Sequence, residues 1–172
     1  NPASRSDFNQ EISIGSAGNG HWNGFTFHTT SSGAVFVGTE IGSRMDPSHV
    51  PSNTVVLNTW QHFAYVYNSG TGRFYKNGVL LATKANSAPP SFDVLRIASG
   101  CCNPIHGGLD ELRIWNTART QAQIQSAMKL ELTGSESNLV VYYNFNQGVA
   151  NNNNAGITTL IDLATGIGGA NN

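Results

Sequence analysis

Charge is the property that this chain has least of. Only 11% of its 172 residues are charged, and the formal net charge is -1. Such a chain carries no basic field that would hold nucleic acid and no polybasic patch for anionic lipid. No apolar run approaches the roughly 18 residues of a membrane-spanning helix, so we expect no membrane insertion.

Cysteine is also scarce, because the chain has only the adjacent pair Cys101 and Cys102. One neighbouring pair is no disulfide framework, and it does not identify a cellular compartment. The pair either forms a vicinal disulfide, which would make a rigid apolar patch at a loop tip, or stays reduced, or sends one cysteine to a part of the protein outside this chain. We expect no zinc site with the nearby His106, since no fourth-ligand pattern follows.

Asparagine and glycine are abundant, with 20 and 19 copies against 9 lysines plus arginines. Both residue types favour turns and left-handed backbone conformations, so the composition is typical of a turn-rich β protein. The length suits one domain with its own hydrophobic core. We therefore predict a single domain over residues 1–172 that ends in an Asn/Gly-rich tail at 149–172.

Short apolar runs alternate with clusters of Gly, Asn, Ser and Pro, which predicts many short strands. The predicted strands are residues 24–29, 34–39, 55–57, 60–67, 73–76, 79–82, 94–98, 109–115 and 139–145. Asn77-Gly78 predicts a type I′ hairpin, because both central residues of that turn need positive φ. One helix is expected over 121–129, with Thr120 as its N-cap. This pattern predicts an all-β fold, an antiparallel β-sandwich with one short helix.

Several aromatic residues are predicted to lie in the core. The strand at 60–67 is apolar on both faces, which indicates a central strand covered on both sides. Strand aromatics of a sandwich usually pack inside, and His62 on such a strand is expected to be a structural residue with its polar atoms satisfied. The aromatic residues that we predict as core are Trp60, Trp115, Tyr143 and Phe145.

Three segments in a fixed order resemble one family. They are TWQHFAYVY at 59–67, RFYKNGVLLAT at 73–83, and GGLDELRIWNTART at 107–120, followed by LVVYYNFNQG at 139–148. Together they resemble the LamG-like jelly-roll family of the concanavalin A-like lectin/glucanase superfamily. The resemblance implies a jelly-roll sandwich in a secreted or surface protein of bacteria.

Both ends depart from the family pattern. The opening strand pair with an aromatic-Thr-x-Glu-x-Trp pattern and the closing strand are not matched. We therefore expect an excised part of a larger polypeptide, associated with other domains of that parent. Alternatively, residues 8–14, with Phe8, Ile12 and Ile14, fill the place of the missing strand.

Asp110 is the candidate metal ligand. Strand alternation places it in phase with Leu112 and Ile114, so its carboxylate is predicted to face the core and to need donors or a cation. Relatives use this strand at a cation site, which implies a structural Ca²⁺ held also by Asp162 or the carbonyls of Gly107–Gly108, since calcium takes about six to eight oxygens. The other reading is a buried aspartate that caps loop N–H groups.

Carbohydrate binding is predicted from loops. Trp22 lies in GNGHWNG beside His21, where its ring either stacks on a sugar or folds back over the core. The loop 42–53 is either a binding loop or a solvated connector. Arg44, Arg73 and the histidines favour an anionic or sulfated glycan. The predicted carbohydrate-binding residues are His21, Trp22, Arg44, His49, Cys101, Cys102, Asn103 and His106.

Catalysis is not expected. Glycoside hydrolysis needs two carboxylates on opposite sides of the bond, whereas Asp110 and Glu111 are strand neighbours that face opposite ways. No serine elbow or metal-hydrolase motif is present. We predict a non-catalytic module that anchors a larger secreted enzyme or surface protein to a polysaccharide. The alternative is an adhesion, protein-interaction or spacer module, because fold alone does not fix function.

Overall fold

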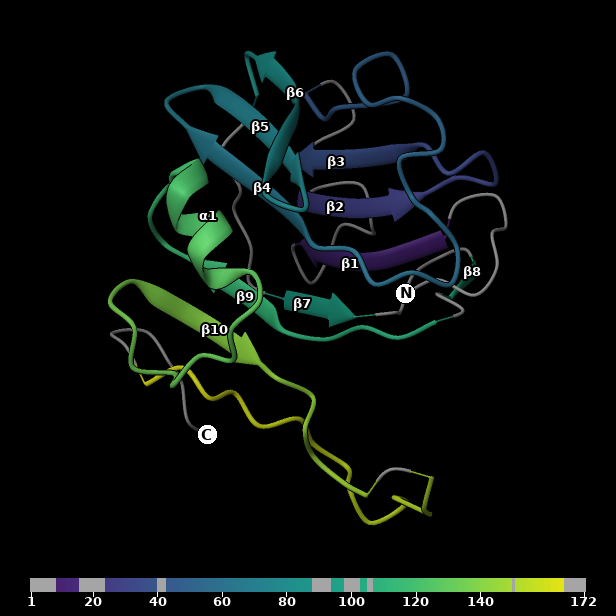
Figure 1. The fold of residues 1–172 in the computed structure, drawn as a ribbon, viewed down its shortest axis with the longest axis vertical. Helices are drawn as coiled ribbons and strands as arrows, with labels where there is room; N and C mark the ends of the chain where they lie inside the picture. The colour runs from purple at the N-terminus through teal and green to yellow at the C-terminus, as the bar shows by residue number, and fades with distance from the viewer. Residues whose placement is uncertain are drawn as a thin grey trace. The chain divides into compact units, whose positions relative to one another are not determined.

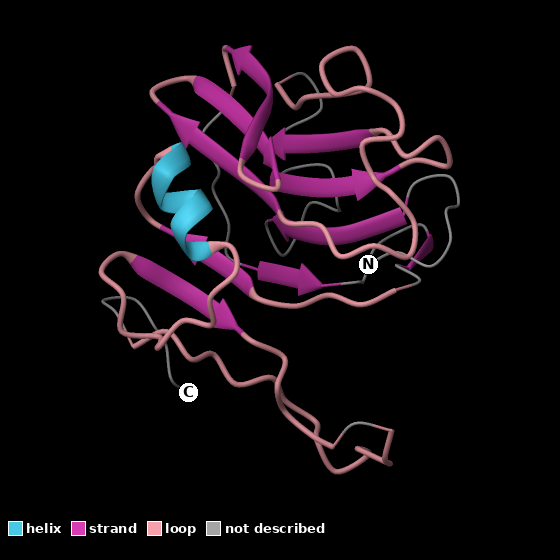
Figure 2. Ribbon diagram, viewed as in Figure 1, coloured by secondary structure: helices cyan, strands magenta, loops and turns pink. Residues whose placement is uncertain are grey.

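The computed structural model describes residues 9–15, 24–39, 43–87, 94–97, 103–104, 107–149 and 151–165. The chain divides into two compact units, the N-terminal unit at 1–108 and the C-terminal unit at 109–172. Figure 1 shows the elements in chain order, and Figure 2 shows that nearly all of them are strands. The single domain over 1–172 stays a prediction.

Two sheets make up the N-terminal unit. The first has the order β3-β2-β1-β7, with β8 beside β1, and the second has the order β4-β5-β6. Every described pairing is antiparallel except that of β8 with β1. The strands are β1 (Asn9–Gly15), β2 (Gly24–Thr29), β3 (Val35–Thr39), β4 (Phe63–Asn68), β5 (Thr71–Lys76), β6 (Val79–Ala85), β7 (Val94–Ile97) and β8 (Asn103–Pro104).

Side chains of the two sheets share one hydrophobic core. Phe27 of β2 lies 5.3 Å from Phe63 of β4, and Phe63 stacks on Phe74 of β5 at 5.7 Å between ring centroids. The fully or nearly fully buried members of this core are Val35, Val37, Met45, Val50, Val55, Phe74 and Ala82. Two sheets that bury facing side chains form a β-sandwich, so the predicted fold class is confirmed.

The predicted Asn-Gly hairpin is confirmed. Asn77 and Gly78 have φ angles of 50° and 76°, as a type I′ turn requires. Asn77 also exchanges two hydrogen bonds with His62: its N–H donates to the His62 carbonyl at 2.8 Å, and its side-chain oxygen accepts from the His62 N–H at 2.9 Å. The turn thus fixes the segment that leads into β4.

Three strand predictions need correction or completion. Residues 55–57 form no strand; the Val55 N–H instead donates to the Gly33 carbonyl at 3.0 Å, and the Val55 side chain is buried. The strand predicted at 60–67 begins only at Phe63, and within the described sheet β5, not β4, lies between two strands. Residues 9–15 form strand β1, which lies between β2 and β7. A strand therefore exists close to residues 8–14, and its role as a substitute for the missing family strand stays a prediction.

The C-terminal unit combines a strand pair with the helix. β9 (Leu112–Trp115) pairs with β10 (Leu139–Tyr143), and α1 spans Gln121–Ala127. Thr120 is the N-cap, because its hydroxyl accepts from the Gln123 N–H while the Gln123 side chain accepts from the Thr120 N–H. This reciprocal capping box confirms the predicted helix start.

The aromatic core prediction was wrong for Trp60 and needs refinement in the C-terminal unit. Trp60 lies before β4 and is 59% exposed. In the C-terminal unit Tyr142 is fully buried, whereas Trp115, Tyr143 and Phe145 are only half-buried. A register shift between Leu139 and Val141 breaks the simple alternation along β10, so that Tyr142 and not Tyr143 is buried there.

The tail returns to the strand pair. The Leu163 N–H donates to the Tyr142 carbonyl at 2.8 Å, and Ala164 is 1% exposed. The return passes close to Gly134, where φ is 86° and a Cβ would lie 2.0 Å from the Leu163 carbonyl oxygen. Part of the predicted polar tail is therefore core. Among the described residues, no helix has the length and apolarity needed to cross a membrane.

Candidate functional site

Asp110 does not face the core as predicted. It is exposed and lies before β9, and its carboxylate accepts a hydrogen bond from the Glu111 N–H at 3.0 Å. Glu111 has φ 55°, a left-handed conformation that interrupts strand alternation. No group of three or more His, Cys, Asp or Glu side chains converges within the described ranges. Asp162, the suggested partner, accepts from the Tyr142 and Ala164 N–H groups instead. Calcium binding at Asp110 stays a prediction.

Glu111, Arg113 and Tyr142 form the buried polar cluster of the C-terminal unit, here called the Glu111 cluster. The Tyr142 hydroxyl donates to the Glu111 carboxylate, with oxygen distances of 3.1 and 3.0 Å, and accepts from the Leu132 N–H at 3.0 Å. Burial first, and then the Glu111 carboxylate, raises the pKa of Tyr142.

Arg113 completes the Glu111 cluster. Its guanidinium contacts the Glu111 carboxylate and donates to the Ala127 carbonyl at 2.9 Å and to the Leu130 carbonyl. Ala127 is the last residue of α1, so the guanidinium ties the strand pair to the helix end. These contacts give the Asp-Glu-Leu-Arg run a structural role.

The loop after β3 is anchored rather than free. Val37 and Met45 exchange backbone hydrogen bonds of 3.0 and 2.8 Å, which extend the first sheet by one short bridge. Met45 and Val50 are fully buried in the core. Because side chains alternate along extended chain, Arg44 and Asp46 lie on the opposite side from Met45. The loop therefore presents polar groups from a fixed backbone, and both the binding-loop and the connector interpretation stay predictions.

Arg44 lies over an aromatic pair. Its guanidinium carbon is 4.7 Å from the Phe36 ring centroid, and the His28 ring stacks on Phe36 with centroids 4.7 Å apart. Burial, and to a lesser degree the Arg44 charge, lowers the pKa of His28 to about 4, so His28 is neutral near pH 7. The cation–π contact holds the Arg44 side chain beside the sheet.

Asp46, His49 and Lys84 form a second polar cluster, here called the His49 cluster. One Asp46 carboxylate oxygen accepts from the Ser48 N–H at 2.9 Å, from the Ser48 hydroxyl at 2.5 Å and from His49 Nδ1 at 3.0 Å. The Ser48 hydroxyl first, and then His49, lowers the pKa of Asp46 to about 2. On the far side of the imidazole, His49 Nε2 lies 3.5 Å from Lys84 Nζ on β6.

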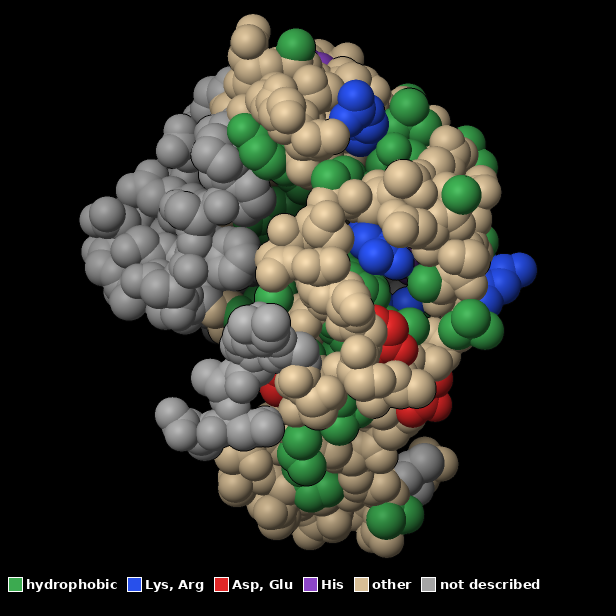
Figure 3. All heavy atoms as spheres, turned by 90° about the vertical axis from the view of Figure 1, so that its left-hand side faces the viewer, with side chains coloured by type: hydrophobic (Ala, Val, Ile, Leu, Met, Phe, Trp, Pro, Cys, Tyr) green, Lys and Arg blue, Asp and Glu red, His purple; other side chains and the backbone are tan. Residues whose placement is uncertain are grey.

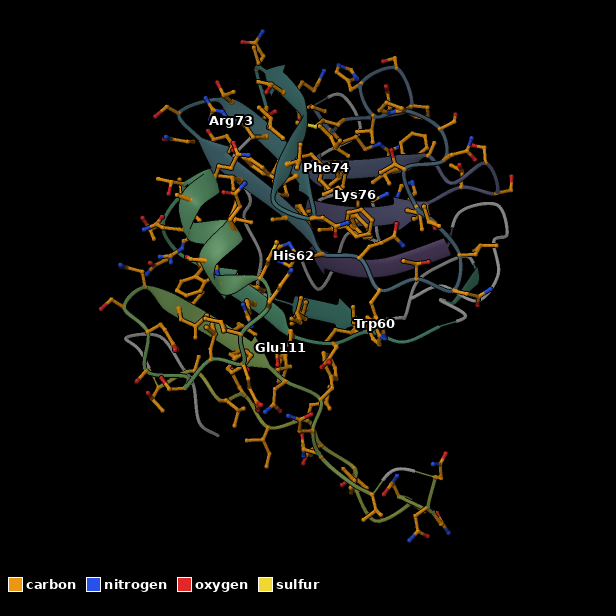
Figure 4. All side chains as sticks on the ribbon, in the orientation of Figure 1. Trp60, His62, Arg73, Phe74, Lys76 and Glu111 are labelled. Carbon is orange, nitrogen blue, oxygen red and sulfur yellow. The ribbon has the colours of Figure 1, made fainter. Side chains whose placement is uncertain are left out.

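Among the described aromatic residues of the N-terminal unit, Trp60 is the exposed one, and it lies in the loop that precedes β4 (Figure 4). Gln61 fixes this loop, since its amide accepts from the Val56 N–H at 2.9 Å and donates to the Val56 carbonyl at 2.7 Å. A Cβ on Gly108 would lie 3.0 Å from Trp60 Cη2, so the edge of the indole packs closely against the backbone there. The side chain as a whole is 59% exposed.

The predicted sugar-binding residues have different outcomes. Arg44 and His49 both lie in the anchored loop, on either side of Asp46 in the sequence. The side chain of Asn103 is not described, and the other predicted residues lie outside the described ranges: His21, Trp22, Cys101, Cys102 and His106. All of these stay predictions.

Sequence reasoning missed Trp60, Phe36, His28 and Lys84 as candidates. The Asn58-Thr59 pair was a usable signal for Trp60, because turn residues there place it before the strand rather than in it. No local signal connects Lys84 to a histidine 35 positions earlier in the sequence.

One face of the molecule, drawn in Figure 3, is mostly uncharged. On the face drawn in Figure 3, lysine, arginine, aspartate and glutamate side chains occur in small separate groups and form no continuous field. This agrees with a charged content of 11%.

Comparison with known proteins identifies the family. A solved structure from Bacteroides ovatus ATCC 8483, provisionally described as a carbohydrate binding protein, matches with a TM-score of 0.68 and 21% identity, over 94% of this chain and 46% of that one. At this identity the likeness shows the fold. No match was found among curated proteins. A family model described as the concanavalin A-like lectin/glucanases superfamily matches residues 1–125, and the chain belongs to this superfamily.

Proposed function

We propose that this chain is a non-catalytic carbohydrate-binding module with Trp60 as its sugar platform. The observation that carries the proposal is the indole of Trp60, 59% exposed on a loop fixed by side-chain hydrogen bonds. A pyranose presents C–H groups on one face, and these pack on an aromatic ring while its hydroxyl groups reach polar neighbours. A rigidly held aromatic ring loses little entropy when it binds.

The superfamily supports this function, because its description names lectins as well as glucanases. The similar Bacteroides ovatus protein is provisionally described as carbohydrate binding. The state of the Asp110-Glu111 pair supports a non-catalytic module: Glu111 is engaged by Tyr142 and Arg113, while Asp110 is exposed before the strand. A glycosidase needs two carboxyl groups free to act on either side of the scissile bond, whereas the Glu111 carboxylate already binds the Tyr142 hydroxyl and the Arg113 guanidinium.

Anchoring is the second part of the proposal. The chain spans 46% of the length of the similar solved protein, which fits a module that works beside other domains. We propose that it holds a larger secreted or surface protein on a polysaccharide. Its partners are then the glycan and the domains of the parent polypeptide.

A protein-binding role is the second candidate, and one observation favours it. β6 carries three consecutive exposed apolar residues, Val79 at 56%, Leu80 at 41% and Leu81 at 37% exposure. β6 ends its described sheet, and exposed strands at sheet edges can pair with another chain. Under this alternative, substitutions on β6 would abolish the binding activity and Trp60→Ala would not.

Affinity electrophoresis in gels containing soluble neutral polysaccharides tests the platform. We expect at least one of β-glucan, xylan and mannan to retard the protein, and Trp60→Ala to weaken that binding about tenfold or more, as loss of a central aromatic contact does. Trp60→Phe should keep part of the affinity. Leu130→Ala is the matched control, because Leu130 is also 59% exposed and lies in the C-terminal unit.

Two outcomes would overturn the proposal. One is the absence of retardation by every glycan tested, and the other is equal retardation of the native protein and Trp60→Ala. Thermal unfolding of each variant shows that it is folded, and a change of more than about 0.5 kcal/mol is not expected for an exposed side chain. Release of reducing ends from the retarding glycan would overturn the non-catalytic part.

A further inference from the structure

We propose that residues 144–149 and 151–161, here called the C-terminal arm, form a surface through which the chain associates with a second copy of itself. The arm leaves β10, turns at Asn151–Asn154 and returns toward Leu163, whose N–H is bonded to β10 (Figure 1). Such self-association goes beyond the proposed carbohydrate binding and is independent of it, because it needs no glycan.

Four large aliphatic side chains of the C-terminal arm are open to solvent. Their exposed fractions are 61% for Val149, 43% for Ile157, 46% for Leu160 and 57% for Ile161. Together they present on the order of 300 Å² of apolar surface, which reaches the size of patches that often have a function in monomeric proteins. Scattered single apolar residues need no explanation, whereas four on one short arm indicate an interaction surface.

Side-chain amides fix the backbone of the arm. The Gln147 amide donates to the Thr159 carbonyl at 3.0 Å and accepts from the Ile161 N–H at 2.7 Å, so it joins the outgoing and the returning chain. The Asn154 amide accepts from the Val149 N–H at 2.9 Å and donates to the Val149 carbonyl at 3.1 Å. The aliphatic side chains are therefore carried by an ordered backbone before association, which lowers its entropic cost.

The two halves of the arm lie close together, and this brings the aliphatic side chains near one another. A Cβ on Gly148, where φ is 95°, would lie 3.0 Å from Ile157 Cδ1. Glycine at this position thus lets Ile157 approach the outgoing chain next to Val149. Gln147 holds the Ile161 backbone near the same part of the outgoing chain.

The charge of the chain favours a second copy as the occupant of this surface. Residues 144–161 contain no charged side chain, and the whole chain has a net charge of -1. Two copies therefore bring together arms without like charges, and their overall repulsion is small. A contact between identical arms about a two-fold axis buries the same aliphatic groups from both copies and leaves no buried charge without a partner.

The area of the arm predicts a weak dimer. Two facing arms bury roughly 600 Å² of aliphatic surface together with some polar surface around it, which is less than the ~1,200 Å² at which stable interfaces begin. We therefore expect a dissociation constant on the order of 0.1 mM, so that the dilute chain is monomeric and the concentrated chain dimerises.

Sedimentation velocity of the glycan-free chain between about 10 µM and 1 mM tests the proposal. The sedimentation coefficient of the native protein should rise with concentration, and the double variant Leu160→Asn/Ile161→Asn should associate at least about tenfold more weakly. Val79→Asn/Leu80→Asn on β6 is the matched control. It removes two aliphatic groups of nearly equal exposure, 56% and 41%, and should associate like the native protein.

A second arm variant and a salt series keep the test decisive if the double variant fails to fold. Val149→Asn lies on the outgoing chain, leaves both Gln147 hydrogen bonds in place and should also weaken association. Added salt should not weaken association, because the contact contains no pairs of charges. Thermal unfolding of each variant shows which of them are folded.

Four outcomes would overturn the proposal. They are a monomer at every concentration, association that salt abolishes, folded arm variants that associate like the native protein, and equal losses in the arm variants and the β6 control. Loss in the β6 control alone would place the contact at the β6 edge instead. None of these outcomes affects the proposed function, because that function is tested by glycan retardation of Trp60→Ala.

Discussion

The Glu111 cluster and the His49 cluster use similar groups in different surroundings. Each centres on a carboxylate that accepts several hydrogen bonds and lies near a cationic side chain. In the first, the Arg113 side chain is 9% exposed and donates to main-chain carbonyls. In the second, Asp46 is 43% and His49 29% exposed, and Lys84 contacts a side chain. We infer that the first cluster stabilises the strand pair and the helix end, whereas the second fixes the loop that follows β3.

Replacing Arg113 with alanine should have the largest effect on stability. It leaves the half-buried Glu111 without its cation and frees the carbonyls of Ala127 and Leu130, and losing these charge-assisted hydrogen bonds costs about 2 to 3 kcal/mol of unfolding free energy. Urea unfolding measures the change. Arg119→Ala is the control, because the contact that Arg119 makes within the described residues is a cation–π contact with Trp115 at 4.1 Å, worth about 0.5 to 1 kcal/mol. Equal losses in the two variants would show that the Glu111 cluster is not a main support of its unit.

Tyr142→Phe should have an intermediate effect. It keeps the buried ring but removes the hydroxyl that donates to Glu111 and accepts from the Leu132 N–H. Leaving these partners unsatisfied costs about 1 to 2 kcal/mol. The denaturant midpoint of Tyr142→Phe should be lower than that of Tyr143→Phe, because Tyr142 is buried and Tyr143 is only half-buried. Glycan affinity should stay the same, and a loss of affinity would place the Glu111 cluster in the binding function.

Asp46→Asn should have the smallest effect, and that effect depends on pH. The pKa of Asp46 is about 2 in the folded chain, below the unfolded value of about 3.9. Its stabilisation is therefore complete above about pH 4 and is lost as pH falls through 2. Since the side chain is 43% exposed, solvent screening limits the gain to about 0.5 kcal/mol.

Melting temperatures between pH 2 and 5 test this expectation. The native protein should lose slightly more stability than Asp46→Asn as the pH falls, because only the native carboxylate takes up a proton there. Parallel curves would mean that the hydrogen bonds from Ser48 and His49 contribute nothing to folding.

Local features were predictable from the sequence. The Asn77-Gly78 turn, the capping box at Thr120 and the strand at 24–29 each depend on residues within a few positions of one another. Their backbone preferences decide the conformation before any tertiary contact forms. These predictions were correct because φ at a turn and hydrogen bonds at a helix start are short-range properties.

Predictions that relied on uninterrupted alternation failed. Two backbone irregularities change which face the following side chains take: the left-handed φ at Glu111 and the register shift after Leu139. Neither glutamate nor leucine is a residue type that predicts such an irregularity. The contact between His49 and Lys84 depends on how the edges of two sheets meet. The sequence therefore indicated His49 as a candidate but not its partner Lys84, because tertiary packing brings the two together.

The return of the tail past Gly134 has a consequence for insertions. Residues 144–161 form a closed loop, since both of its ends are held at β10 by the Tyr142 and Leu163 backbone groups. The Asn151–Asn154 turn at its far end is exposed throughout. Because loop-closure entropy grows only with the logarithm of length, doubling this loop would cost about 0.6 kcal/mol. A peptide tag placed there should leave both the sandwich and the helix intact.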